Sequence, residues 1–161
     1  MRNIVVVLMG TLALAGCGDS GPDYTGGGEV NPGDLVVNEV SAFGVGSDWF
    51  ELYNAGGTEV DLTDWSFTDD IVDRSNTSPF PTGLTVPAGG YAHVQFDATY
   101  PGFGLKGDEE LGLIGPDGDV VDSANWDEGE SPDGGSFARI PDGTGPFTTT
   151  SEATPGAANK P

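Results

Sequence analysis

Two glutamates lie inside apolar segments of this chain, where acidic residues need an explanation. Glu39 is in "VVNEV" and Glu51 is in "DWFELYN", and both segments have the short apolar pattern of β-strands. Burial of a carboxylate is costly unless the group is paired and hydrogen-bonded. Two acids about 5 to 10 Å apart are the minimum for glycoside hydrolysis. The pair is therefore a candidate for catalysis, for metal binding or for a structural role.

The other ingredients of an active site are scarce. His93 is the single histidine, and it alternates with Tyr91 and Gln95 on the predicted solvated face of a strand. The chain contains no nucleophile elbow, P-loop or dinucleotide-binding fingerprint. A small domain without long loops also lacks walls for a sugar cleft. We predict that the protein is not an enzyme, with a carboxylate-dependent glycan hydrolase as the alternative.

The structural role requires partners for the two carboxylates. Arg139, in "SFARIPDG", is the basic residue placed inside an apolar strand. Its planar guanidinium group can bind two carboxylate oxygens at once. Our hypothesis is that Glu39 and Glu51 form part of the scaffold and are satisfied by Arg139 or by backbone amides.

Clusters of acidic residues raise the question of calcium, which prefers hard oxygen ligands. No cluster follows the spacing of an EF-hand loop, and a hairpin turn selects Asp and Gly anyway. No cofactor is predicted, and calcium binding is left open. The candidate ligands are Asp69, Asp70, Asp73, Asp117, Asp119 and Asp122, with a further cluster at Asp127, Glu128 and Glu130.

Length and composition indicate one folded domain with a strong negative charge. The 161 residues include 36% hydrophobic residues, which is enough for a packed core despite 27 glycines and 12 prolines. Acidic residues number 26 against five basic ones, and the formal net charge is −21. Such a field opposes binding to nucleic acid and to anionic headgroups. It favours cations or basic partners, or it is an adaptation to a saline habitat.

The N-terminal residues have the pattern of an export signal. Arg2 is followed by an uncharged apolar stretch that is too short to span a bilayer, and then by "LAGC". This ending resembles the lipobox of bacterial lipoproteins, which implies cleavage after residue 16 and acylation of Cys17. Gly18, where an aspartate would signal retention in the inner membrane, favours the outer membrane. We expect a signal peptide at 1–16, a lipidated flexible tether at 17–33 and a domain at 34–161.

The domain has the pattern of an all-β protein. Short β-branched and aromatic runs alternate with Gly, Pro, Asn and Asp clusters, and no window has a helical period. This number of half-buried strands predicts an immunoglobulin-like antiparallel β-sandwich. The predicted strands are near residues 35–42, 49–54, 59–62, 65–68, 91–97, 110–114, 120–126 and 136–140.

The order of several strings resembles the lamin tail domain family, in the form found in bacterial secreted and surface proteins. The strings are "VVNEV", "DWFELYNAGGTEVDLTDWSFTDD", "VPAGGYAHVQFD", "GDEELGLIGPDGDVVDSANW", "GSFARIPDGTG" and "TPGAAN". The resemblance covers about residues 35–159 and implies an immunoglobulin-like sandwich. It does not imply filament assembly, because the chain has no heptads, basic run or prenylation motif.

Two functions remain open from the sequence. The first is a binding or attachment module at the cell envelope, which contacts a protein or a glycan through exposed aromatic residues such as Trp49, Tyr53 or Trp126. The second is a structural lipoprotein that forms an acidic surface coat without a specific ligand. Trp65 and Phe67 are expected in the core under either hypothesis. Both hypotheses place the protein at the membrane through a lipid on Cys17.

Overall fold

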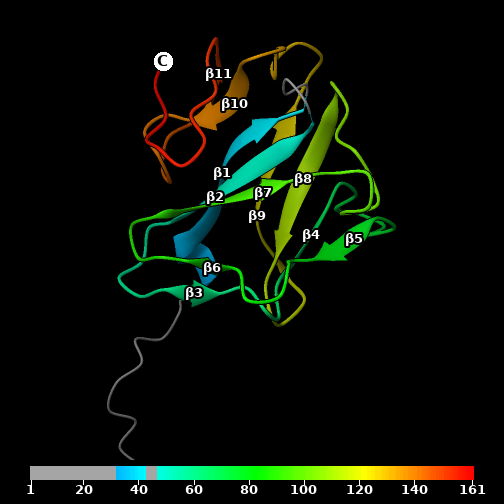
Figure 1. Cartoon of the computed structure of the whole chain (residues 1–161), viewed down its shortest axis with the longest axis vertical. Coiled ribbons are helices and arrows are strands. Elements are labelled where there is room, and N and C mark those ends of the chain that lie inside the picture. The colour runs from blue at the N-terminus through cyan, green and yellow to red at the C-terminus, as the bar shows by residue number, and fades with distance from the viewer. Residues whose placement is uncertain (1–31, 43–46) are drawn as a thin grey trace, which may run out of the picture.

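The structure, a computed structural model, describes residues 32–42 and 47–161, which form an antiparallel β-sandwich (Figure 1). A short 3-10 helix, η1 (Pro32–Asp34), precedes the first strand. The predicted signal peptide, Cys17 and nearly all of the predicted tether lie outside the described residues. The strands are β1 (Leu35–Ser41), β2 (Trp49–Asn54), β3 (Val60–Asp61), β4 (Ser66–Thr68), β5 (Thr77–Pro79), β6 (Thr85–Val86), β7 (Tyr91–Gln95), β8 (Glu109–Ile114), β9 (Val120–Trp126), β10 (Ser136–Arg139) and β11 (Phe147–Thr150).

The strands form two main sheets and one small one. The five-stranded sheet has the order β11-β10-β1-β2-β7, and the four-stranded sheet has the order β5-β4-β8-β9. Strands β3 and β6 pair with each other in the small sheet. The eight strands predicted from the sequence are all present, with ends that differ by no more than two residues. The additional strands β5, β6 and β11 have two to four residues and lack an alternating apolar pattern, so their pairing depends on neighbours brought by the fold.

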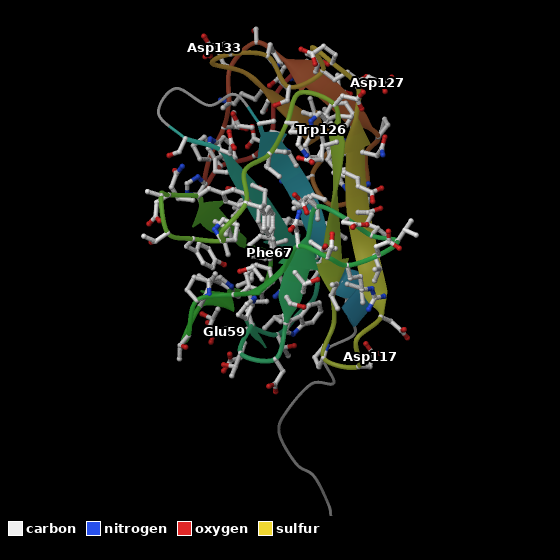
Figure 2. All side chains as sticks on the ribbon, turned by 90° about the vertical axis from the view of Figure 1, so that its right-hand side faces the viewer. Glu59, Phe67, Asp117, Trp126, Asp127 and Asp133 are labelled. Atoms are coloured by element: carbon white, nitrogen blue, oxygen red, sulfur yellow. The ribbon has the colours of Figure 1, made fainter. Side chains whose placement is uncertain are left out.

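Aromatic side chains from both sheets meet in the core. Phe50 and Leu52 of β2 are fully buried, as is Phe67 of β4 in the opposite sheet. The rings of Phe50 and Phe67 are 4.8 Å apart between centroids and meet edge to face. Figure 2 shows Phe67 in the middle of the sandwich. Each such buried side chain contributes about 1.5 to 3 kcal/mol to stability through its removal from water.

Strand β7 and residue Trp65 confirm the predicted division between core and surface. Ala92 and Val94 are buried on the core side of β7, whereas His93 is exposed on the other side. Trp65 is 3% exposed and belongs to the core cluster together with Phe67. The alternation with a period of two therefore identified the buried face correctly.

A β-bulge in β1 determines which of its residues enter the core. The pairing of β1 with β2 shifts register between Val37 and Glu39. Val37 is in the core before the bulge, and Val40 is in the core after it. The extra residue, Asn38, turns Glu39 away from the core and toward the outer face of the five-stranded sheet.

The register of β1 and β2 defines two ends of the sandwich. Leu35 pairs with Asn54 at one end, where the described chain begins, and Ser41 pairs with Trp49 at the other end. Acidic side chains lie at both ends, with Glu59 and Asp117 at one and Asp127 and Asp133 at the other (Figure 2). Among the described residues, no helix is long and apolar enough to span a bilayer.

Candidate functional site

The outer face of the five-stranded sheet carries the two glutamates and several aromatic residues. Phe50 and Leu52 of β2 point to the core, so the alternate residues Trp49, Glu51 and Tyr53 point to the opposite face. Strand β7 continues this face, since Glu51 pairs with His93 and Tyr53 pairs with Tyr91. The ring centroids are 4.9 Å apart for Trp49 and His93, and 5.1 Å apart for Tyr53 and Tyr91.

Glu39 and Glu51 lie directly opposite each other on β1 and β2, and both side chains are 0% exposed. Glu39 accepts hydrogen bonds from the Ser136 hydroxyl, from the Thr154 backbone amide at 2.9 Å and from the Thr154 hydroxyl at 3.2 Å. The carboxylate is therefore held by neutral donors. Its full burial leaves no route for a substrate to reach the pair in this arrangement.

Glu51 is less completely satisfied than Glu39. Its Oε2 atom accepts a hydrogen bond from the Gly156 amide, whereas Oε1 is buried without a hydrogen-bond partner. Burial raises the pKa of Glu51 to about 7; the Gly156 hydrogen bond opposes this rise, and the charges of Glu39 and Asp142 add to it. Both carboxylate oxygens of Glu39 therefore have hydrogen-bond donors, whereas one carboxylate oxygen of Glu51 has none.

The cover over this pair is residues 154–159, which we name the C-terminal strap. The Asn159 side-chain amide donates to the backbone oxygens of Asn38 at 3.1 Å and Arg139 at 3.0 Å. The Thr154 hydroxyl lies 2.8 Å from Asn159 Oδ1, so the two ends of the strap are joined to each other. The strap is the string "TPGAAN", and no local pattern indicates the surface that it covers.

Asp142 extends the hydrogen-bond network of the C-terminal strap. Its Oδ1 accepts hydrogen bonds from the Asn38 side chain at 2.9 Å and from the Asn159 amide at 3.1 Å. Its Oδ2 accepts the hydroxyl of Tyr91 at 3.0 Å. Burial, followed by this hydrogen bond and the charge of Asp142, raises the pKa of Tyr91 to about 12. Sequence analysis did not identify Asn38, Asp142 or Tyr91 as parts of the site, because their contacts join segments that are remote in the chain.

The hypothesis that Arg139 pairs with Glu39 or Glu51 is wrong. Arg139 Nη2 binds both oxygens of Asp122, at 2.9 and 3.1 Å, and Nε donates to the Val37 carbonyl at 2.9 Å. The reason is the alternation of β10. Ala138 is the partner of Glu39, so Arg139, one residue further, has its side chain on the opposite face. Backbone amides, the other expected partners, do bind both glutamates, and side-chain hydroxyls also bind Glu39.

The six candidate calcium ligands are dispersed, five of them in connections between strands and Asp122 in β9. Asp70 accepts hydrogen bonds from the Asp73 amide and the Ser75 hydroxyl, and Asp117 accepts one from the Asp119 amide. Asp122 is bound to Arg139. Asp69 is 8% exposed, and its Oδ1 has no hydrogen-bond partner. Within residues 32–42 and 47–161, no group of three or more His, Cys, Asp or Glu side chains is placed to hold a metal ion.

The aromatic residues expected on a binding surface are more buried than that hypothesis requires. Trp126 is 0% exposed, and its indole nitrogen donates to the Lys106 carbonyl at 2.8 Å. Trp49 is 7% exposed beneath the His93 ring, while Tyr53 is half-buried. Trp126 is thus a core residue, and Tyr53 retains partial access to solvent. The pKa of His93 is lowered by burial.

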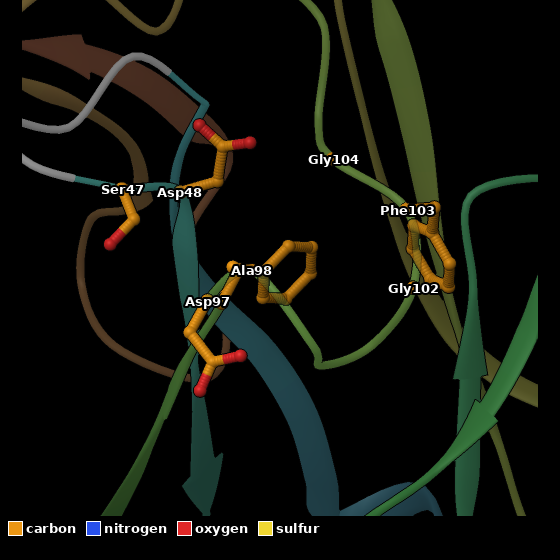
Figure 3. A pocket seen from close by; sticks show the side chains of 8 residues that line it. Ser47, Asp48, Asp97, Ala98, Gly102, Phe103 and Gly104 are labelled. Atoms are coloured by element: carbon orange, nitrogen blue, oxygen red, sulfur yellow. The ribbon is translucent and has the colours of Figure 1, made fainter.

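An open hollow of about 630 Å³ lies beyond the end of β7 (Figure 3). Asp48 and Asp97 are on one side of it and Phe103 is on the other (Figure 3). Burial raises the pKa of Asp48, against the effect of the Leu105 amide that its Oδ2 accepts at 2.8 Å. The lining residues are Ser47, Asp48, Phe96, Asp97, Ala98, Gly102, Phe103 and Gly104.

A second hollow, of about 420 Å³, shares Asp97 with the first and includes His93 and Tyr100 in its lining. The Asp97 carboxylate accepts hydrogen bonds from the Thr99 and Tyr100 amides, which lower its pKa. Sequence analysis missed both hollows. The available signal was the run of aromatic residues within the Gly- and Pro-containing segment "FDATYPGFG".

The fold defines a class of protein. Two packed antiparallel sheets, with turns at both ends, constitute an immunoglobulin-like module. A sequence model of the Lamin Tail Domain matches residues 29–128, which is more than half of the chain. The chain therefore belongs to the lamin tail domain family, which is a family of immunoglobulin-like domains and not a known family of enzymes.

The match ends before the last two strands. It extends from the first strand through β9, whereas β10, β11 and the C-terminal strap follow it. The resemblance drawn from the sequence extended to residue 159, so the family match is shorter than that interpretation. Among curated proteins, no sequence matches the chain at a significant level.

Proposed function

We propose that the protein is a non-enzymatic lipoprotein of the bacterial cell envelope that presents its lamin tail domain as a binding or attachment module. The string "LAGC" supports lipid attachment at Cys17, and the outer membrane is the favoured location. The protein needs no metal or cofactor for this role.

The hollow between Asp97 and Phe103 is the observation that carries the binding function. It lies next to Trp49 and Gln95, which pair at the end of the sandwich opposite Leu35. A chain anchored through its N-terminus would present this end away from the membrane. Carboxylates beside aromatic rings favour a ligand that carries positive charge on an apolar body, such as a lysine or arginine side chain of an envelope protein.

Site-specific photocrosslinking tests the proposal in bacterial cells that produce the full chain. A photoreactive residue replaces Ala98, which is exposed in the hollow, or Ala55, which is exposed at the opposite end. We expect an adduct from position 98 and none from position 55. The additional substitution Phe103→Ser should abolish the adduct. Equal labelling at the two positions would contradict a specific surface at the hollow.

Lipid attachment is tested separately. Mass spectrometry of the mature full chain should find acyl chains on residue 17, and Cys17→Ala should release the protein from the membrane fraction. One acyl chain gives marginal binding, whereas several give durable anchoring. An unmodified Cys17 in a secreted product would exclude the lipoprotein hypothesis and leave the hollow unaffected.

The second candidate function is an acidic surface coat without a specific ligand. It is favoured by the acidic side chains at both ends of the sandwich (Figure 2) and by the net charge of −21. This function predicts no selective adduct from either position. Instead, replacement of several exposed carboxylates by amides should increase aggregation of the protein in proportion to the charge removed.

A further inference from the structure

The C-terminal strap is attached to the sheet through the Glu39 and Glu51 carboxylates at its first residues and through Asn159 at its end. The amide of Thr154 binds Glu39, and the amide of Gly156 binds Glu51. Glu51 lies on the face opposite the core, between the inward residues Phe50 and Leu52, so only a covering segment can bury it. Its 0% exposure therefore depends on the docked strap.

The carboxylate pair has neutral hydrogen-bond donors and no cationic partner in the part of the chain that the structure describes. The ion pairs there are Lys106–Glu109 and Arg139–Asp122, and neither includes Glu39 or Glu51. Like charges directly opposite each other on adjacent strands are destabilising. A buried carboxylate without a counter-charge is also costly, and it is usually neutralised by a proton.

The other groups around Glu51 do not supply a positive charge that could neutralise the pair. Asp142 adds a negative charge from the connection between β10 and β11, and the Tyr91 hydroxyl is directed to Asp142. The Tyr53 side chain is on the same face and has no cationic group. His93, the register partner of Glu51 on β7, is more than a third exposed, and the partial burial of its ring lowers its pKa, which disfavours a positive charge there. The residues next to the strap, Glu152 and Lys160, are both exposed.

We propose that the Glu39–Glu51 pair holds one proton while the strap is docked, and that loss of this proton releases the strap from the sheet. Oε1 of Glu51, which is buried without a hydrogen-bond partner, is the atom that gains most from neutralisation. The geometry thus assigns to the pair a pH-dependent closure of the C-terminal segment. This inference is independent of the proposed binding function.

The direction of the pH dependence follows from the sign of the shift. Burial raises the pKa of Glu51 from its ordinary value of 4.5 to about 7, against the hydrogen bond from Gly156. Because an undocked strap would expose Glu51 to water, the docked state binds a proton that the undocked state has already lost at neutral pH. Docking of the strap is therefore strongest below the pKa of Glu51 in the undocked state. It weakens as the pH rises through the pKa of Glu51 in the docked state. Between pH 6 and pH 8.5, the docking equilibrium should fall by about tenfold.

Two NMR measurements on the full chain test the proposal. The side-chain carboxyl ¹³C shift of Glu51 should titrate near neutrality. The hydrogen-exchange protection of the Gly156 amide, corrected for intrinsic rates, should fall by about tenfold from pH 6 to pH 8.5. Titration of Glu51 in the ordinary acidic range, or equal protection at both pH values, would overturn the proposal.

Matched variants identify the group responsible. Glu51→Gln keeps an acceptor for the Gly156 amide and cannot ionise, so it should make the protection of Gly156 independent of pH. Glu152→Gln makes the same change on an exposed side chain beside the strap and should retain the wild-type dependence. An unchanged dependence in Glu51→Gln would also overturn the proposal. If this variant does not fold, the titration of Glu51 in the wild-type chain decides.

Discussion

Asp122 of β9 binds Arg139 of β10 through both of its carboxylate oxygens, and this pair joins the four-stranded sheet to the five-stranded sheet. Both residues also bind the backbone of Val37. Asp122 Oδ2 accepts the Val37 amide at 2.8 Å, and Arg139 Nε donates to the Val37 carbonyl at 2.9 Å. The guanidinium carbon lies 4.4 Å from the centre of the Phe147 ring. The pair thus satisfies the backbone beside the β1 bulge.

Arg139→Lys should lower the free energy of unfolding by about 1 to 3 kcal/mol, because an ammonium group cannot bind Asp122, Val37 and the Phe147 ring together. Urea denaturation of the full chain measures this loss. Arg74→Lys is the control, since Arg74 is exposed and its guanidinium contacts the Gly118 carbonyl on the surface. Equal effects of the two substitutions would contradict a special role for Arg139.

Glu51 should make the fold more stable in mild acid than in mild base. Its folded pKa of about 7 is above the ordinary value of 4.5, so its stabilising proton is present at low pH and is lost as the pH rises through 7. From pH 5.5 to pH 8.5, this group should reduce the free energy of unfolding by ~2 kcal/mol. Urea denaturation at both pH values should show a smaller reduction in Glu51→Gln than in the wild type.

His93 should make the fold less stable in mild acid, which is opposite to the effect of Glu51. Burial lowers its pKa below 6.5, so the folded state resists protonation and the stability from this group is lost as the pH falls. Histidine ¹⁵N NMR of the full chain should find the titration below that of an unfolded control peptide. His93→Gln should reduce the loss of stability between pH 7 and pH 5. A titration at or above 6.5 would contradict the role of burial.

Gly135 should not tolerate a side chain, because of the close approach of β11. A Cβ atom added there would overlap the Thr150 carbonyl oxygen and would lie 2.9 Å from a side-chain carbon of Pro132. Gly135→Ala should therefore lower the free energy of unfolding by about 2 to 4 kcal/mol. Gly57→Ala is the control, since nothing lies within 4 Å of its added Cβ. Thermal unfolding should separate the two variants clearly.

The regular part of the fold was predictable because its signal is local. In β2, Phe50 and Leu52 alternate with Glu51, and in β7, Ala92 and Val94 alternate with His93. Such alternation specifies a strand and its buried face without knowledge of the partner. Strand β11, with the sequence "FTTT", has no such pattern. Its position depends on its pairing with β10, in which Thr149 of β11 lies opposite Phe137 of β10.

The candidate site was predictable only in part. The buried glutamates were recognised from their place in apolar strands, and backbone amides were among the partners expected for them. Arg139, a basic residue within an apolar strand, is the wrong partner, because it binds Asp122. Its neighbour Ala138 is the residue that pairs with Glu39. Because successive side chains of a strand point to opposite faces, Arg139 points away from Glu39.

The sequence by itself determined the all-β class, the core face of the main strands and the burial of two acidic residues, because these properties depend on residues close together in the chain. Tertiary structure decided which groups meet those acids. Thr154 and Gly156 are more than 100 positions from Glu39 and Glu51, and the β1 bulge sets which face Glu39 occupies. Contacts of that separation depend on sheet order and register, which no local pattern specifies.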